Sequence, residues 1–319
     1  MLVGLGVLIL TLVLVALGAS YYVYRVAFYV PPRYRQDIAQ LPCSEEGSGK
    51  HEILCLCIQR LCELPYEAVT IHAVDGKKLF GRYYHTKEGA PVQIQFHGYR
   101  GSALRDFCGG TAFACKMGYN ALVVDQRCHG CSEGDTITFG IMERYDCQSW
   151  ANYAYQRFGD HTPLILSGVS MGATTVLMAS CLEMPKTVCG IVADCPYSSP
   201  LAIITKVAQE MGLPRKPAAA LCKLGALVYG RFRVGDSSVL SSVRKTNLPI
   251  LLLHGEEDQL VPCEMSREIY QACGADRGLV TFPGASHGMS YLADPQKYEA
   301  TVEGFLQHCF RRMEKEKGS

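Results

Sequence analysis

From residue 67 onward, the hydrophobic and polar positions of the chain follow two alternating patterns. Segments 67–73 and 78–85 alternate apolar and polar residues on either side of Asp75-Gly76, which is typical of a β-hairpin. Short apolar runs then predict buried strands at 92–96, 120–125, 163–166, 188–193, 249–253 and 278–282. Segments between and after these strands have apolar residues at helical spacing. They predict helices at 106–117, 141–158, 173–179, 263–272 and 294–313. This order predicts an α/β fold with a mostly parallel sheet covered by helices on both faces.

The N-terminal segment has a different pattern. Residues 2–24 carry no charge and are mostly Leu, Val, Gly and Ala. As a helix, an apolar run of this length can cross a bilayer core of about 30 Å. Aromatic and basic residues, as found at membrane interfaces, come at Tyr21, Tyr22, Tyr24, Arg25, Arg33 and Arg35. We therefore predict a single-pass transmembrane anchor over residues 1–30. The arginines after the span favour a cytoplasmic location for the rest of the chain.

A cleaved signal peptide is the alternative for this segment. Ala16-Leu17-Gly18 is similar to a cleavage site. However, no Lys or Arg precedes the apolar run, and the run is longer than the apolar part of a signal peptide. Residues 31–66 then form a predicted connector, because Pro31-Pro32 ends any helix that leaves the membrane and 45–50 is typical of a loop.

Composition narrows the range of functions. The chain has 319 residues, of which 48% are hydrophobic and 19% charged, and its net charge of +1 argues against a nucleic-acid-binding protein. The 16 cysteines are scattered through predicted strands and helices, as in proteins of a reducing compartment. Cys128-His129-Gly130-Cys131 is a C-x-x-C motif, but no second pair follows at the spacing of a zinc site. We expect neither a metal nor a cofactor.

One short motif indicates chemistry. Gly168-Val169-Ser170-Met171-Gly172 lies between the strand predicted at 163–166 and the helix predicted at 173–179. A G-x-S-x-G pattern between strand and helix is typical of a nucleophile elbow, in which glycines avoid collisions that larger residues would cause. The turn exposes the Ser170 hydroxyl. It also leaves the Met171 N–H at a helix N-terminus, where it can stabilise an oxyanion.

Polar residues follow the predicted strands at their carboxyl ends, which meet at one edge of a parallel sheet. They are His97, Asp125, Ser170, Asp194, Asp258 and His287. We predict that His287, in a loop of small residues, is the base that takes the Ser170 proton. His97 and His254 are expected to be structural. His129 is the main alternative to His287 as the reactive histidine.

The base needs a carboxylate to orient it. Asp258 is the predicted partner of His287, because the chain returns to apolar residues directly after it. Asp194, which follows the preceding strand, is the alternative. The second oxyanion donor is expected from the loop after the strand at 92–96, at the N–H of Tyr99. We predict that the side chains of Tyr99, Arg100 and Tyr197 contact substrate, with Arg100 near the mouth of the site. A solvated loop charge is the alternative for Arg100.

These motifs resemble those of the α/β-hydrolases, over about residues 67–312. The resemblance rests on the elbow, the order Ser170, Asp258, His287, and the segments His97-Gly98-Tyr99, 124–132, 254–258 and 286–288. Through 138–146 and 194–199 the chain is similar, more narrowly, to bacterial membrane-anchored hydrolases of the serine aminopeptidase S33-like and acyl-esterase branch. The resemblance implies a catalytic triad of those three residues, with Tyr99 and Met171 as oxyanion donors, on a bacterial plasma membrane. Cys128 and Cys131 depart from the pattern, because relatives commonly have Gly at the first of these positions and a variable residue at the second.

The resemblance also implies a domain organisation. The hydrolase core would occupy 67–195 and 248–319, with a helical lid over 196–247 that contains helices near 200–211 and 217–229. The charges of this segment are mostly basic: Lys206, Arg215, Lys216, Lys223, Arg231, Arg233, Arg244 and Lys245 against Glu210 and Asp236. We weigh an ordinary solvated cap against a surface that rests on anionic lipid.

The predicted function is that of a serine hydrolase, which cleaves a carboxylic ester or thioester through an acyl-enzyme at Ser170. The substrate would be a small acyl ester, a lipid or a peptide-like molecule. An aminopeptidase or amide hydrolase that uses the same triad is one alternative. A membrane-tethered, non-catalytic binding protein with a hydrolase fold is another.

Overall fold

A computed structural model describes residues 2–31 and 49–318 of the chain. In this part of the chain, eight strands form one sheet with the order β1-β2-β4-β3-β5-β6-β7-β8. β1 pairs antiparallel with β2, and β2 antiparallel with β4, while all other neighbours are parallel. The strands are β1 (Glu67–His72), β2 (Lys78–Tyr84), β3 (Val92–Phe96), β4 (Asn120–Asp125), β5 (Leu164–Val169), β6 (Val188–Asp194), β7 (Ile250–Gly255) and β8 (Arg277–Phe282). The predicted hairpin and the mostly parallel sheet are therefore confirmed.

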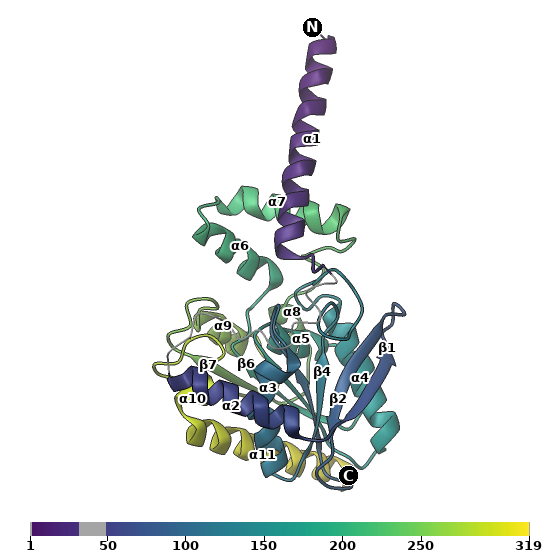
Figure 1. Cartoon of the computed structure of the whole chain (residues 1–319), viewed down its shortest axis with the longest axis vertical. Helices are drawn as coiled ribbons and strands as arrows, with labels where there is room; N and C mark the ends of the chain where they lie inside the picture. The colour runs from purple at the N-terminus through teal and green to yellow at the C-terminus, as the bar shows by residue number, and fades with distance from the viewer. Residues whose placement is uncertain (1, 32–48, 319) are drawn as a thin grey trace.

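Helices cover both faces of this sheet (Figure 1). They are α2 (Gly49–Glu63), α3 (Ala103–Lys116), α4 (Glu143–Phe158), α5 (Met171–Ala179), α9 (Glu264–Ala272), α10 (Ser290–Ala293) and α11 (Pro295–Gly318). Side chains of α4, α5 and α9 pack with Leu166 and Ile191. Side chains of α11 pack with Ile165 and Val192, the neighbours that point to the opposite face. This burial on both faces explains why the central strands are continuous apolar runs.

Helix α2 is a difference from the sequence prediction. The connector predicted over residues 31–66 contains this helix, which packs on α3. Its apolar residues Leu54, Ile58 and Leu61 have helical spacing and lie in the cluster with α3. The predicted loop at 45–50 includes the first residues of α2, and its remaining residues, with Arg33 and Arg35, lie outside the described part of the chain.

Helix α1 (Leu2–Ala27) projects away from the globular part of the molecule (Figure 1). By length and composition it is a candidate membrane span or signal sequence, and its most apolar stretch is not buried. The helix ends at Ala27, before the Pro31-Pro32 pair that we predicted to stop it. It ends there because Phe28 is buried between the rings of Phe139 and Phe232. The backbone of Val30 then bonds to Asp135.

The segment 196–247, here called the lid segment, lies between α1 and the sheet (Figure 1). It contains α6 (Pro200–Glu210) and α7 (Arg215–Val228), close to the two predicted helices, and the short α8 (Val239–Val243). Helix α7 packs directly on α1, where a Cβ added at Gly225 would lie 2.6 Å from the Ser20 carbonyl oxygen. The Tyr229 hydroxyl donates to the Leu17 carbonyl at 3.1 Å. The C-terminal part of α1 thus packs against the folded domain.

Candidate active site

Ser170 lies in a strained turn between β5 and α5. Its φ of 55° and ψ of −114° are rare for a residue with a side chain. The turn is held by the Ser170 N–H, which donates to the Asp194 carbonyl at 2.8 Å. It also requires Gly172, where a Cβ would lie 1.8 Å from the Phe96 carbonyl oxygen. The predicted strand, sharp turn and helix are present, and they place the hydroxyl at the carboxyl end of the sheet.

The structure brings Ser170, His287 and Asp258 together. Ser170 Oγ lies 2.9 Å from His287 Nε2, and His287 Nδ1 lies 2.6 Å from Asp258 Oδ2. Because the carboxylate can only accept, Nδ1–H donates to Asp258 and Nε2 is left to accept the Ser170 proton. The three residues come from the loops after β5, β7 and β8, at the same edge of the sheet. A serine hydroxyl next to a neutral, oriented imidazole is the arrangement of an activated nucleophile.

Asp258 is held as an anion. Oδ1 accepts from the N–H groups of Leu260, at 3.0 Å, and Val261, at 2.8 Å. Burial would raise the pKa of Asp258, but bonds from His254 and His287 outweigh burial and lower the pKa to about 2. The ring of His254 is itself buried and bonds to the Val261 carbonyl and the Ser266 hydroxyl, which agrees with the structural role expected for it.

The alternative acid, Asp194, has other partners. Its Oδ1 accepts from the Ser290 hydroxyl at 2.9 Å, and its carbonyl accepts the Ser170 N–H. Burial raises the pKa of Asp194 to about 6, against the effect of the Ser290 bond. His287 donates its Nδ1–H to Asp258 and not to Asp194, so Asp194 supports the elbow rather than the imidazole.

The loop after β3 lies against the nucleophile. A Cβ at Gly98 would be 3.4 Å from Ser170 Cβ. The Gly98 N–H donates to Asp106 Oδ2 at 2.7 Å, and the Arg100 N–H donates to His129 Nε2 at 3.1 Å. Between these two, the Tyr99 N–H has no hydrogen-bond partner among residues 2–31 and 49–318. The loop can therefore offer this donor to a ligand at Ser170.

Two buried histidines hold this loop. Nε2 of His129 accepts from Arg100, so its proton lies on Nδ1, which donates to the Arg127 carbonyl at 2.8 Å. Burial lowers the pKa of His129 to about 3, which keeps the ring neutral. His97 similarly donates to the Gly98 carbonyl and accepts from the Gln126 N–H. Both ring nitrogens of His129, the alternative for the reactive histidine, are therefore hydrogen-bonded to backbone groups.

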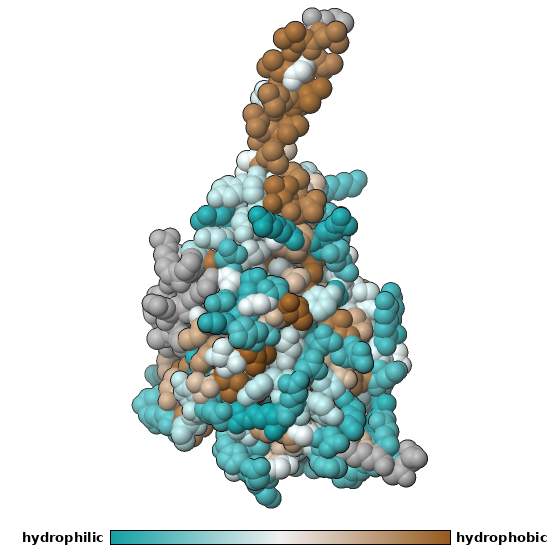
Figure 2. All heavy atoms as spheres, turned by 90° about the vertical axis from the view of Figure 1, so that its right-hand side faces the viewer, coloured by the Kyte–Doolittle hydropathy of each residue, from teal (hydrophilic) through white to brown (hydrophobic). Residues whose placement is uncertain are grey.

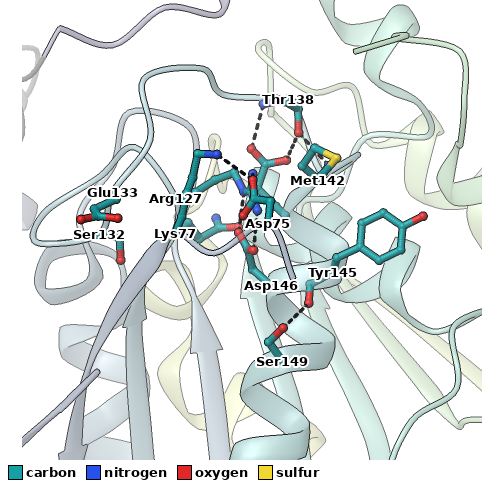
Figure 3. Close-up of polar contacts among 12 residues, drawn as sticks. Asp75, Lys77, Arg127, Ser132, Glu133, Thr138, Met142, Tyr145, Asp146 and Ser149 are labelled. Carbon is teal, nitrogen blue, oxygen red and sulfur yellow. Dashed lines mark hydrogen bonds and ion pairs between the residues drawn. The ribbon is translucent and has the colours of Figure 1, made fainter. Parts of the chain in front are cut away.

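An ion-pair cluster centred on Arg127, two residues before His129, fixes this part of the chain (Figure 3). The Arg127 guanidinium makes two bonds of 2.6 Å to the Asp146 carboxylate and one of 3.1 Å to Asp75. Paired bonds of this kind define the position of both side chains. Close by, Glu143 accepts from the N–H groups of Thr138, at 2.8 Å, and Gly140, at 2.9 Å. These bonds stabilise a turn in which Phe139 has a φ of 56°.

The side chains predicted to contact substrate have partners within the protein. The Tyr99 hydroxyl donates to the Ala27 carbonyl, and the Arg100 guanidinium donates to the carbonyls of Val26 and Tyr29. Tyr197 is buried, and its hydroxyl donates to the Phe139 carbonyl at 3.1 Å. That Tyr99 lies at the acyl group and Arg100 at the mouth stays a prediction, because these bonds do not test it. Carbonyl groups at the end of α1 accept hydrogen bonds from the Tyr99 hydroxyl and the Arg100 guanidinium. Nothing in the sequence near residues 99–100 indicates a partner so distant in the chain.

In the described residues, one set of three potential metal ligands lies within 4.8 Å: Cys195, Asp258 and His287. Burial raises the pKa of the Cys195 thiol well above its usual range, so the thiolate that a metal prefers is disfavoured. Both ring nitrogens of His287 are also engaged, by Asp258 and Ser170. The donor set therefore suits proton transfer better than metal binding.

Comparisons with known proteins identify the family of the chain. The family model described as serine aminopeptidase, S33 matches residues 92–239 and 226–292. The uncharacterized protein YqkD of Bacillus subtilis is 25% identical over 193 residues, which is 60% of this chain and 63% of YqkD. The chain thus spans less than two thirds of the length of that relative.

Two solved structures are similar in fold. The Pyrococcus furiosus esterase Pf2001 has a TM-score of 0.62 at 23% identity, over 78% of this chain and 93% of the esterase. Est1E from Butyrivibrio proteoclasticus, solved with ferulic acid bound, has a TM-score of 0.60 at 22% identity, over 76% and 100% of the two chains. The family match covers more than half of the chain, which therefore belongs to the serine aminopeptidase S33 family of the α/β-hydrolase superfamily.

Proposed function

We propose that the chain is a serine hydrolase that acts through an acyl-enzyme at Ser170. The observation that carries the proposal is the continuous hydrogen-bonded series Ser170, His287, Asp258 on a strained elbow. The membership of the chain in a hydrolase family supports it. Both features agree with a nucleophile, a base and an orienting acid.

In the proposed reaction, Ser170 Oγ attacks the substrate carbonyl while His287 Nε2 takes the hydroxyl proton. The carbonyl oxygen becomes an oxyanion, which the N–H groups of Tyr99 and Met171 stabilise. His287 then gives its proton to the leaving group, and the acyl group remains on Ser170. A water molecule loses a proton to His287, attacks the acyl carbon and releases the acid, and the proton returns to Ser170. The anionic Asp258 stabilises the imidazolium in both halves of the cycle.

A carboxylic ester or thioester is the substrate class that we favour. Two proteins of the same fold, Pf2001 and Est1E, are an esterase and a protein solved with ferulic acid bound. An aminopeptidase, as the family description suggests, would need an acidic group to bind the substrate amine. The acids of the lid segment are Glu210 and Asp236, and Glu210 is exposed and paired with Lys206 at 2.6 Å. Faster release of aminoacyl amides than of short acyl esters would contradict the ester preference.

We also propose that α1 anchors the enzyme in a membrane, with the catalytic domain on the cytoplasmic side of a bacterial plasma membrane. The apolar stretch of α1 is exposed along its length, as a membrane span would be. The possible cleavage site Ala16-Leu17-Gly18 lies inside the helix, and the Leu17 carbonyl accepts from Tyr229. A cut there would disrupt an intact contact, which favours an uncleaved anchor.

A fluorophosphonate probe tests the proposal, since such probes react with activated serines. The folded full-length chain should be labelled, and Ser170→Ala should abolish both labelling and p-nitrophenyl acetate turnover. Ser286→Ala is the matched control, because Ser286 is exposed next to His287 but is not part of the relay. An unlabelled but folded wild type would instead favour a non-catalytic binding protein.

A further inference from the structure

The outward face of α7 differs from that of an ordinary solvated helix. Its buried side, which faces α1 and the domain, consists of small residues: Ala218, Cys222, Gly225 and Ala226. Its exposed side has Lys216, Ala220, Lys223 and Leu227 at helical spacing, and no acidic residue occurs in the helix. Lysines that alternate with apolar residues are typical of helices that lie in a membrane interface.

Large apolar side chains are exposed at both ends of this helix. Met211 and Leu213, in the turn before α7, are 65% and 46% exposed. Leu227 and Val228, in its last turn, are 51% and 45% exposed. Solvent-exposed apolar groups that lie together, and are not scattered, indicate an interaction surface. We call this set, with Lys216 and Lys223, the α7 face.

The position of α7 along α1 fits the edge of a bilayer. The two helices meet at Ser20 and Leu17 of α1. At a rise of about 1.5 Å per residue, Ser20 lies about 27 Å from Leu2, close to the thickness of about 30 Å of a hydrocarbon core. Tyr21 and Tyr22, at the same level, are partly exposed, as interfacial tyrosines are. Figure 2 shows the apolar surface of α1 ending where it meets the more hydrophilic globular part.

The charges around the α7 face are complementary to an anionic surface. The exposed basic residues of the lid segment include Arg215, Lys216, Lys223, Arg231 and Arg233. Of the two acids in the segment, Glu210 is neutralised by Lys206. Each basic residue near an anionic leaflet adds to the strength of membrane binding.

We infer that the α7 face binds the surface of an anionic phospholipid bilayer beside α1. The inference rests on the proposed membrane span of α1 but not on the proposed catalysis. In this arrangement the apolar residues of the α7 face enter the acyl-chain boundary and the lysines meet the headgroups. The lid segment is then held between the bilayer and the carboxyl edge of the sheet.

Quenching by brominated lipid tests the inference. The full chain is reconstituted in nanodiscs of phosphatidylglycerol brominated on its acyl chains, as Leu10→Trp, Leu227→Trp and Tyr270→Trp variants. Trp150, the single tryptophan of the chain, is buried and gives the same background in each. Tyr270 is the matched control, because it is exposed beside Arg277 at the opposite end of the sheet. We expect Leu10→Trp and Leu227→Trp to be quenched at least about twofold more than Tyr270→Trp.

Each result decides the inference. Quenching of Leu10→Trp with Leu227→Trp no different from the control would leave the anchor in place and overturn the α7 face. Emission of Leu227→Trp that responds to protein density but not to bromine would assign the face to a second copy of the chain. Absence of quenching at Leu10 would remove the membrane span and the inference with it. Fluorophosphonate labelling of the same samples reports on catalysis separately.

The headgroup charge is tested in the same system. Replacing the anionic lipid by brominated phosphatidylcholine should reduce the quenching of Leu227→Trp, because the lysines lose their partners. A Lys216→Glu/Lys223→Glu double variant should reduce this quenching in the anionic lipid. Lys315→Glu, at another exposed lysine near the far end of α11, should not. Equal quenching in both lipids would overturn the assignment of an anionic surface.

Discussion

The hydroxyl group of Tyr99 donates a hydrogen bond of 2.8 Å to the backbone carbonyl of Ala27, the last residue of α1. The neighbouring Arg100 guanidinium bonds to Val26 and Tyr29 at 2.8 Å and 3.2 Å. The last carbonyls of a helix lack intrahelical donors, and a cation is favourable at this end of the helix dipole. The loop that we propose to stabilise the oxyanion is therefore bonded to the end of the predicted anchor.

Loss of these bonds should lower turnover more than substrate binding. Arg100→Met and Tyr99→Phe release side chains that fix the loop, and the N–H of Tyr99 then spends less time in position. We expect kcat to fall about 3- to 10-fold with a smaller change in KM, measured by steady-state hydrolysis of p-nitrophenyl esters. Arg267→Met, at an exposed arginine on α9, is the control. Unchanged kcat in both loop variants would show that the contact with α1 does not influence the site.

Asp258→Asn should nearly abolish activity, while Asp194→Asn should not. An amide at position 258 can donate to His287 Nδ1 and so favour the wrong tautomer, which costs about 10⁴-fold in kcat in enzymes with such a relay. Asp194 contacts Ser290 and the elbow backbone, so its replacement should cost far less. Measurement of kcat for both variants with one ester separates the two acids. The reverse order of losses would assign the orienting role to Asp194.

The stability of the wild type relative to Asp194→Asn should depend on pH. The pKa of Asp194 is about 6 in the folded chain and about 4 when unfolded, so between these values the folded state binds more protons. Stability therefore falls as pH rises through this window, by about 3 kcal/mol in total. Urea unfolding of both proteins in detergent at pH 4 and pH 7.5 measures the difference. A difference that is constant with pH would contradict a raised pKa at this site.

Gly172→Ala should destabilise the fold strongly. The added Cβ would meet the Phe96 carbonyl at 1.8 Å, and backbone on both sides must move, which costs about 3 kcal/mol or more. Gly304→Ala in α11 is the matched control, because nothing lies within 4 Å of its Cβ position. It should stabilise the helix by about 0.5–1 kcal/mol. Thermal unfolding of the two variants gives opposite shifts in Tm if the elbow is as crowded as described.

Much of the core could be predicted because local sequence determines it. The strands β3 to β7 are apolar runs, since both faces of the sheet are covered, and their carboxyl ends identify where polar residues meet. Ser170 and Asp258 follow two of these strands, β5 and β7, and His287 lies in the loop after β8. Their proximity therefore follows from strand direction alone, before any side-chain position is known.

Other features depend on contacts between distant parts of the chain. The partners of Tyr99 and Arg100 lie more than 70 residues away at the end of α1, and no local pattern encodes them. Helix α2 was missed because loop-like residues precede it. Cys128 adopts a φ of 69°, although its side chain disfavours that conformation. The bond from its N–H to the Glu133 carbonyl stabilises the turn, which sequence alone does not show.

The contact between α1 and the loop at Tyr99 has a consequence for substrate choice. With α1 in a bilayer, the serine is not carried on a flexible tether that samples a wide volume. The hydrogen bonds from Tyr99 and Arg100 to the end of α1 would hold it within a thin layer parallel to the membrane. Ser170 can reach the scissile bond of a substrate that lies at that depth. A substrate whose scissile bond lies deeper in the bilayer must first move outward. The anchor then sets the distance of Ser170 from the membrane. The depth of a substrate's scissile bond selects substrates together with the chemistry of that bond.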